Sequence, residues 1–211
     1  MTKTAILFDL DGVLIDSETE YTRFWGDTGR KYNLPDPNFA ANIKGTTLTQ
    51  ILSFFDESDR DDVVEAIHDF EKHMEYPYFP GVEDFLHKLR DSGIPTAVVT
   101  SSDDVKMSYL FKVHPELKKL ITCFITGSQV KKSKPDPEGY LTAANKLGVA
   151  PEDCFVFEDS IQGLNAGQSS GATVVGVVTT NPLAKVEPLS DIVIHSFTEL
   201  TVDRLLAFRQ R

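Results

Sequence analysis

The stretch AILFDLDG, residues 5–12, places a short apolar run directly before two aspartates. Its first four residues are apolar without interruption, which is typical of a strand buried on both faces of a parallel sheet. Side chains two residues apart in an extended segment point to the same side, so Asp9 and Asp11 are expected to face one place while Leu10 packs into the core. The stretch predicts a buried strand that ends at a pair of carboxylates.

Four further apolar runs resemble the first, at residues 96–99, 155–157, 173–178 and 192–194. The segments between them show helical spacing, and Gly93 and Gly148 follow two of these segments as C-terminal stops. Strand and helix alternate from residue 81 to the end, so we expect an α/β fold with a doubly wound, Rossmann-like parallel sheet.

Residues 16–78 break this alternation, because they contain helical patterns and no convincing strand. We therefore expect an α/β core of residues 1–15 and 79–211 with an all-helical insertion over 16–78. Ser58 is expected to cap a helix from Val63 to Met74, and Thr46 or Thr47 to cap a helix over residues 48–55.

The charge balance disfavours polyanionic partners. The 211 residues include 21 Lys and Arg against 32 Asp and Glu, a formal net charge of −11, and no run of Lys and Arg longer than two residues. Nucleic acids and anionic membrane surfaces need clustered positive charge, so neither is expected as a partner.

The chain has no apolar run of the roughly 18–20 residues that span a bilayer. Asp9 and Asp11 interrupt the N-terminal apolar patch, which argues against a signal peptide and favours a cytoplasmic protein. Cys123 and Cys154 form no CxxC pair and are expected to be buried free thiols. Nothing in the sequence demands more than a monomer.

Acidic and phosphate-binding groups follow several of the predicted strands. Ligands of a doubly wound sheet bind at the carboxyl ends of its strands. The candidate site residues there and in the loop before the helix at 138–147 are Asp9, Asp11, Thr100, Ser101, Lys134, Glu158 and Asp159. So many carboxylates in one place require a cation. Oxygen ligands without His or Cys favour Mg²⁺ over zinc.

This set of residues suits phosphoryl transfer. One aspartate attacks phosphorus, and the other protonates the leaving oxygen and then activates water. Thr100, Ser101 and Lys134 are expected to bind the phosphoryl oxygens, with Mg²⁺ offsetting the developing charge. Each motif alone has a simpler interpretation, since an Asp-x-Asp pair often caps a turn and Lys-Pro is common in loops. The hypothesis depends on their combination.

Four segments contain the candidate residues: FDLDGVLIDSE (8–18), VVTSS (98–102), KSKPDP (132–137) and FEDSIQGLNAG (157–167). Together they closely resemble the four motifs of the haloacid dehalogenase superfamily, most of all those of its β-phosphoglucomutase and phosphoglycolate phosphatase group. Members of that group carry a helical cap after the first motif.

The resemblance implies a role for each matching residue. Asp9 corresponds to the nucleophile, and Asp11 to the general acid/base that also lends its backbone carbonyl to Mg²⁺. Thr100 and Lys134 correspond to the phosphate clamp, and Glu158 with Asp159 to the metal-binding acids. True dehalogenases lack the second Asp and the metal acids, so the resemblance implies phosphoryl transfer.

The sequence departs from the mutases at the positions near a second phosphate. Tyr21 stands in place of a His, Leu48 in place of an Arg, and Asp103 and Asp104 in place of a Lys and an Asn. Two acids would repel a second phosphate dianion, so a bisphosphate intermediate is disfavoured.

Several residues of the insertion are candidates for contact with the leaving group: Ser17, Tyr21, Trp25, Lys44 and Lys72. Tyr21 and Trp25 lie four residues apart on one helical face, where core packing is an equally good interpretation. Lys44 and Lys72 are equally explained as exposed lysines without a contact.

We therefore expect a Mg²⁺-dependent phosphatase that hydrolyses a small phosphorylated metabolite, such as a sugar phosphate, through a phospho-Asp9 intermediate. One alternative is a β-phosphoglucomutase-like phosphomutase. Another is a signalling receiver domain, which shares the sheet, Mg²⁺ and an Asp acceptor. Asp11 and the helical insertion favour an enzyme over a receiver.

Overall fold

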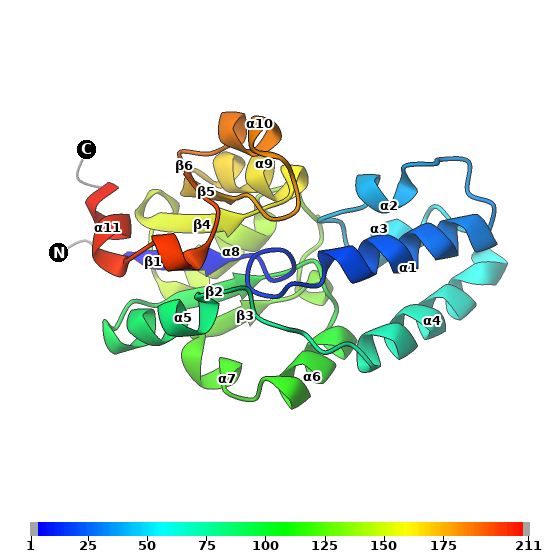
Figure 1. The fold of residues 1–211 in the computed structure, drawn as a ribbon, viewed down its shortest axis with the longest axis horizontal. Coiled ribbons are helices and arrows are strands. Elements are labelled where there is room, and N and C mark those ends of the chain that lie inside the picture. The colour runs from blue at the N-terminus through cyan, green and yellow to red at the C-terminus, as the bar shows by residue number, and fades with distance from the viewer. Residues whose placement is uncertain (1–3, 209–211) are drawn as a thin grey trace.

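A six-stranded parallel sheet forms the centre of the protein (Figure 1). The computed structural model describes residues 4–208. The strand order is β3-β2-β1-β4-β5-β6. The strands are β1 (Ala5–Phe8), β2 (Thr96–Val99), β3 (Cys123–Ile125), β4 (Cys154–Glu158), β5 (Thr173–Val177) and β6 (Ile192–Ile194). This topology confirms the predicted α/β class and puts β1 next to the point where the chain reverses its direction across the sheet.

The sequence did not predict β3. It is an edge strand of three residues, and Cys123 and Phe124 are only half-buried, so its apolar run is too short to stand out. Both cysteines are free, as expected, but only Cys154 is buried. The expectation of burial was wrong for Cys123 because its strand has one neighbour in the sheet.

Alternate residues of β1 pack against opposite helical layers. Ile6 and Phe8 contact one apolar cluster, and Ala5 and Leu7 contact another. The helices of the first layer are α5 (Val82–Asp91), α6 (Asp104–Val113), α7 (Leu117–Leu120) and α11 (Val202–Ala207). Those of the second are α8 (Glu138–Leu147), α9 (Ile161–Ser170) and α10 (Leu183–Val186). Because both faces are covered, β1 and β4 are buried along their whole length.

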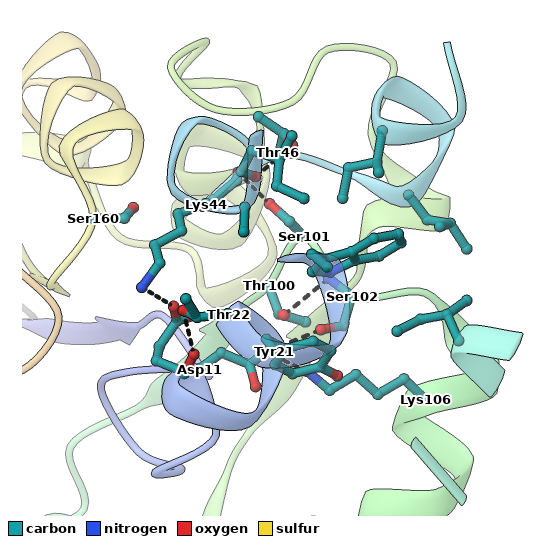
Figure 2. Close-up of a pocket in the computed structure, with 18 of the residues that line it drawn as sticks. Asp11, Tyr21, Thr22, Lys44, Thr46, Thr100, Ser101, Ser102, Lys106 and Ser160 are labelled. Atoms are coloured by element: carbon teal, nitrogen blue, oxygen red, sulfur yellow. Dashed lines mark hydrogen bonds and ion pairs between the residues drawn. The ribbon is translucent and has the colours of Figure 1, made fainter. Parts of the chain in front are cut away.

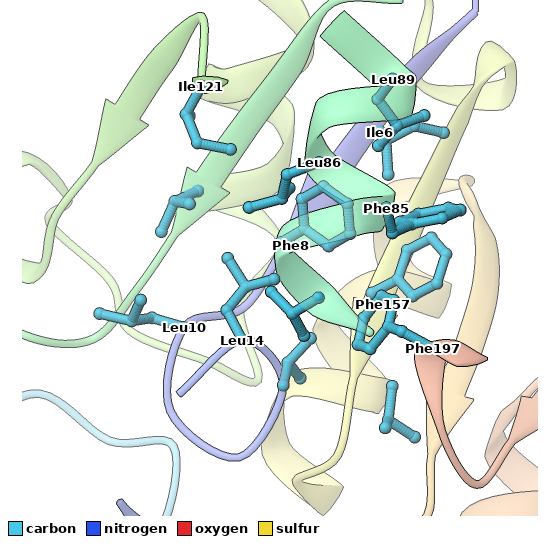
Figure 3. Close-up of a cluster of buried hydrophobic side chains, with 14 of the residues drawn as sticks. Ile6, Phe8, Leu10, Leu14, Phe85, Leu86, Leu89, Ile121, Phe157 and Phe197 are labelled. Carbon is cyan, nitrogen blue, oxygen red and sulfur yellow. The ribbon is translucent and has the colours of Figure 1, made fainter. Parts of the chain in front are cut away.

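Four phenylalanine rings pack behind the ends of β1 and β4 (Figure 3). The ring centroids of Phe8 and Phe157 are 5.0 Å apart, and those of Phe85 and Phe197 are 5.5 Å apart. Such aromatic pairs add roughly 0.5–1.5 kcal/mol to the effect of burial. Asp9 and Glu158 follow Phe8 and Phe157 directly, so this cluster fixes the start of both acidic segments.

Residues 18–72 form a separate group of helices beyond the end of the sheet (Figure 1). They are α1 (Glu18–Lys31), α2 (Phe39–Asn42), α3 (Leu48–Leu52) and α4 (Arg60–Lys72). This four-helix segment has its own apolar cluster, which includes Trp25, Phe39, Ile51 and Ile67. No described helix is long and apolar enough to cross a membrane.

Two helix starts were predicted in this segment. Thr47, one of the two predicted alternatives, is the N-cap residue of α3, but its side chain makes no capping hydrogen bond. The helix ends at Leu52 rather than at residue 55. The prediction of Ser58 was wrong. A 3-10 turn over Glu57–Asp59 precedes α4, and Asp59 is its N-cap residue, because the helix begins three residues earlier than the apolar pattern.

The four-helix segment leaves the sheet and returns to it at one place. The Asp16 amide donates to the Pro77 carbonyl at 2.8 Å, and the Phe79 amide donates to the Leu14 carbonyl at 3.1 Å. The two connections therefore run side by side just beyond Asp11. This pairing holds the helices over the carboxyl ends of β1 and β2.

We predict that Gly163→Ala lowers stability by about 3 kcal/mol, because a Cβ cannot enter this packed site without displacing a buried side chain. In α9 that Cβ would lie 1.8 Å from Oε1 of Glu158. Gly26→Ala is the matched control, since its Cβ would meet no atom closer than 3.6 Å. It should stabilise α1 by up to about 1 kcal/mol. Urea unfolding of both variants checks the prediction, and equal effects would contradict it.

Candidate active site

A buried lysine links the ends of three adjacent strands. Lys134 Nζ donates to Asp9 Oδ1 at 2.7 Å, to Glu158 Oε1 at 2.5 Å and to the Val99 carbonyl at 3.1 Å. Burial alone would lower the pKa of Lys134, but the two carboxylates outweigh it and raise that pKa. The ammonium group is therefore charged and is held directly beside Asp9.

Both carboxylate oxygens of Glu158 have donors. Oε1 also accepts from the Tyr140 hydroxyl at 2.6 Å, and Oε2 accepts from the backbone amide of Asp159 at 3.1 Å and the Ser160 hydroxyl at 3.1 Å. The side chain has no exposed surface. Glu158 is thus fixed in place and positions Lys134.

Asp159 has no such partners. It is 1% exposed, and no described side chain forms a well-aligned hydrogen bond with either carboxylate oxygen, the nearby Thr180 hydroxyl included. Burial raises the pKa of Asp159, and the nearby Glu158 and Asp9 raise it further. Burial likewise raises the pKa of Asp9 to about 7, against the opposing effect of Lys134. An uncompensated buried carboxylate is costly unless a cation or a proton neutralises it.

Asp9, Glu158 and Asp159 offer oxygens that lie within 4.8 Å of one another. This group is all-oxygen, buried and short of positive charge, so it fits a hard divalent cation. Mg²⁺ meets these conditions, and the two free oxygens of Asp159 are the observation that favours it. The donor set does not suit zinc, which prefers nitrogen and sulfur ligands.

Asp11 lies beside this acidic group, and three side chains hold it, of which Ser102 and Lys106 are labelled in Figure 2. The Ser17 hydroxyl donates to Oδ1 at 2.5 Å. The Ser102 hydroxyl donates to Oδ2 at 3.1 Å, and Lys106 Nζ donates to the same oxygen. As expected from the alternation of an extended segment, the intervening Leu10 is fully buried in the core.

A pocket of about 790 Å³, counted with its open mouth, lies between the carboxyl edge of the sheet and the four-helix segment. The polar side chains on its sheet side belong to Asp9, Asp11, Thr100, Ser101, Ser102, Asp103, Lys106, Asp159 and Ser160. Those from the four-helix segment include Glu18, Tyr21, Thr22, Trp25, Lys44, Thr46 and Glu71.

The structure brings most of the predicted residues of the insertion to this pocket. Tyr21, Trp25 and Lys44 line it. Trp25 also packs in the helical apolar cluster, as the core interpretation expects, and its contact with a substrate stays a prediction. Lys44 pairs with Glu18 at 2.9 Å. Ser17 reaches Asp11 instead of lining the pocket. Lys72 is exposed and does not line the pocket, so its predicted contact with the substrate gains no support.

The hydroxyl groups after β2 contact different partners. Thr100 lines the pocket and its Oγ1 accepts from the Ser102 amide at 3.0 Å. The Ser101 hydroxyl donates to the Gly45 carbonyl at 2.7 Å, so it joins the sheet to the four-helix segment. The Ser101 hydroxyl was predicted to bind phosphate, but in this structure it donates to the protein backbone instead.

The far wall of the pocket carries acidic side chains. The Tyr21 hydroxyl donates to Glu71 Oε1 at 2.9 Å, and His68 Nε2 lies 3.0 Å from Asp103 Oδ2. Asp104 turns away from the pocket and accepts from the Thr126 hydroxyl at 2.7 Å. Of the two acids that were expected near a second phosphate, only Asp103 faces the pocket.

The sequence did not single out Lys106, Glu71 or Ser102. The sequence position of Lys106 could have indicated its role. A lysine in the first turn of a helix is unfavourable, because it lies beside the positive end of the helix dipole. Such a residue indicates an acidic partner. Glu71 lies in an ordinary amphipathic helix and carried no signal of this kind.

Glu71 gives a pH-dependent prediction. Burial raises its pKa from 4.5 to about 7, so between these values the folded protein binds a proton that the unfolded chain releases. Stability therefore falls as the pH rises through this window. The free energy of unfolding of Glu71→Gln, relative to that of wild type, should be about 2–3 kcal/mol higher at about pH 8 than at about pH 5. Urea unfolding at both pH values measures this gain. The exposed Glu65→Gln on the same helix should show no such gain, and a flat Glu71→Gln difference would contradict the prediction.

Comparison with known proteins gives consistent results. A family model for haloacid dehalogenase-like hydrolases matches residues 6–177. The chain is 31% identical over 209 residues to hexitol phosphatase A of Escherichia coli (strain K12), covering 94% of this chain and 93% of that one. It is 31% identical over 207 residues to validoxylamine A 7'-phosphate phosphatase of Streptomyces hygroscopicus subsp. limoneus, covering 92% and 94%.

The fold matches a crystal structure of β-phosphoglucomutase from Clostridium difficile with a TM-score of 0.81 at 22% identity, covering 99% of this chain and 98% of that one. Because the family match includes β1, the four-helix segment, Lys134 and the Glu158-Asp159 pair, this chain belongs to the haloacid dehalogenase-like hydrolase family.

Proposed function

We propose that the protein is a Mg²⁺-dependent phosphatase that hydrolyses a sugar phosphate or a similar small phosphomonoester through a phospho-Asp9 intermediate. The observation that carries the proposal is the geometry at Asp9. Lys134 holds one oxygen of this carboxylate, the unpartnered Asp159 lies within 4.8 Å of it, and both Asp9 and Asp159 line the pocket that Asp11 enters.

The enzyme class rests on the family. The chain is a phosphoric monoester hydrolase, since the family model covers residues 6–177 and its relatives over nearly the whole chain are named phosphatases. A receiver domain has no support from these comparisons.

The first step joins Asp9 to the substrate. A carboxylate oxygen of Asp9 attacks phosphorus, the phosphorus–oxygen bond to the leaving group breaks, and Asp11 gives a proton to the departing alkoxide. Lys134 neutralises charge beside Asp9 and orients the carboxylate. Thr100, which lines the pocket, supplies a hydroxyl donor to the phosphoryl oxygens.

The second step releases phosphate. Asp11 takes a proton from a water molecule, the water oxygen forms a bond to phosphorus, and the bond between phosphorus and Asp9 breaks. Inorganic phosphate and free Asp9 result, and Asp11 has regained its proton. One residue serves as acid and then as base, so its position must suit both steps.

The acidic group suits the cation that this chemistry needs. Asp9, Asp159 and the backbone carbonyl of Asp11 would hold Mg²⁺, while Glu158, whose oxygens are all engaged, would support them through Lys134 and Ser160. When bound, the ion neutralises charge on the phosphoryl group and on the acids around it.

The pocket wall favours a substrate with one phosphate and an uncharged, hydroxyl-bearing leaving group. Glu71 and Asp103 line the pocket, and both lysines that line it are already paired, Lys44 with Glu18 and Lys106 with Asp11. A second phosphate would meet carboxylates there, and like charges in a partly buried site repel strongly. This supports hydrolysis over a mutase cycle through a bisphosphate.

We further propose that residues 1–15 and 79–211 act as the core domain and residues 16–78 as a cap over the leaving group. The paired connections near Ile15 and Tyr78 support this division. The bond from Ser101 to Gly45 and the hydrogen bond between His68 and Asp103 support a closed cap in this structure.

We expect Mg²⁺-dependent phosphate release from at least one member of a panel that contains glucitol 6-phosphate, mannitol 1-phosphate, glucose 6-phosphate, glucose 1-phosphate, glycerol 1-phosphate and phosphoglycolate. Asp9→Asn should lower kcat by at least about 1000-fold, because the nucleophile is lost. Asp104→Asn is the control, since this carboxylate faces away from the pocket and should keep near wild-type activity.

Chelation with EDTA should abolish turnover, and Mg²⁺ should restore it. Conversion of glucose 1-phosphate to glucose 6-phosphate without phosphate release would replace the proposal with the mutase. Release that survives Asp9→Asn would overturn the phospho-Asp9 route.

A further inference from the structure

We propose that Lys106 is a positioning residue that holds the carboxylate of Asp11 for proton transfer to the leaving group. This inference rests on the proposed function, because Asp11 transfers the proton there. It assigns a role to a side chain that lies outside the four sequence motifs, in the first turn of helix α6.

The environment of Lys106 is unfavourable for a lysine that has no partner. Lys106 is 2% exposed, and Lys134 is the only other lysine that is buried among the described residues. It also occupies the first turn of α6, where the helix dipole repels a cation. Desolvation and the dipole both oppose this charge, so a compensating anion must stabilise it.

Asp11 accepts from this ammonium through one oxygen, which leaves the other oxygen to carry the proton that Asp11 transfers. Lys106 also acts on the buried Glu71, so the compensating charge is shared between the two acids. Lys106 Nζ donates to Oδ2 of Asp11, while the hydroxyl of Ser17 binds Oδ1. The Lys106 ammonium also lies 4.5 Å from the centre of the Tyr21 ring, a cation–π contact with helix α1. In Figure 2 the side chain extends from α6 toward Tyr21 and Asp11.

These contacts fix the direction of the Asp11 carboxylate. Ser17 and Lys106 approach from different elements, so rotation of the carboxylate would break at least one bond. Ser102 adds a second donor on Oδ2 at 3.1 Å. Proton transfer in a transition state depends on such alignment, and a misplacement of about 1 Å can cost about 100-fold in rate. Lys106 therefore affects the step in which the leaving oxygen needs a proton.

The test compares two substrates that differ in that need. An alkyl phosphate releases a strongly basic alkoxide, which must be protonated, whereas 4-nitrophenyl phosphate releases a stable phenolate. We expect Lys106→Met to lower kcat/KM for the fastest alkyl phosphate of the panel by about 100-fold and for 4-nitrophenyl phosphate by less than about 5-fold. The parameter kcat/KM excludes the later hydrolysis of phospho-Asp9, which is common to both substrates.

Two further variants make the result decisive. Lys112→Met removes an exposed lysine from the same helix and should change neither value. Ser102→Ala removes the weaker donor to Oδ2 and should show the same selective loss, about 5-fold on the alkyl phosphate, as expected for one hydrogen bond. If Lys106→Met does not fold, as judged by circular dichroism, Ser102→Ala alone decides.

Equal losses on both substrates, or no loss on either, would overturn the positioning role while leaving the phosphatase intact. Equal losses would indicate that Lys106 binds the phosphoryl group or only supports the fold. A wild-type protein that hydrolyses neither substrate would overturn the proposed function and this inference with it.

Discussion

The ion pairs of Lys134 are the contacts on which the geometry of the site depends. One ammonium group joins Asp9 after β1, Glu158 at the end of β4 and the Val99 carbonyl at the end of β2. Removal of one partner from a buried ion pair leaves an uncompensated charge, at a cost of roughly 3–5 kcal/mol. The order of the strands brings these groups together, and the lysine prevents their carboxylates from repelling one another.

Lys134 does not balance the local charge completely. It faces two carboxylates, and the buried Asp159 beside them has no partner among residues 4–208. The raised pKa values of Asp9 and Asp159 have the same cause, since burial without enough positive charge favours the protonated acid. A divalent cation would relieve this imbalance and leave Asp9 ionised as a nucleophile. The proposed requirement for Mg²⁺ follows from this charge deficit.

The four-helix segment completes the site from the other side. It contributes Tyr21 and Glu71 to the far wall, and its connections run beside each other just after Asp11. Asp11 therefore lies where the sheet meets the helices, and residues from both hold its two oxygens. The proposed acid/base residue, Asp11, is positioned by this junction, whereas the proposed nucleophile, Asp9, is positioned by the end of β1 and by Lys134.

The sequence by itself determined the parallel α/β class, the helical insertion and the acidic group at the strand ends. These follow from local patterns, namely continuous apolar runs, helical spacing and polar residues directly after a strand. Strand β3 was not predicted because it has only three residues, two of them half-buried, and gives no clear pattern. Ser58 was chosen as a cap because the apolar spacing does not mark the first turn of α4.

Only the tertiary structure decided which side chains meet across the pocket. Lys106 and Asp11 are 95 residues apart, and Tyr21 and Glu71 are 50 residues apart, so no local pattern links either pair. Local sequence also fails to distinguish Glu158 from Asp159, although the two are adjacent. The oxygens of Glu158 accept hydrogen bonds, whereas those of Asp159 do not. Their different roles depend on donors that distant segments bring to one of them and not to the other.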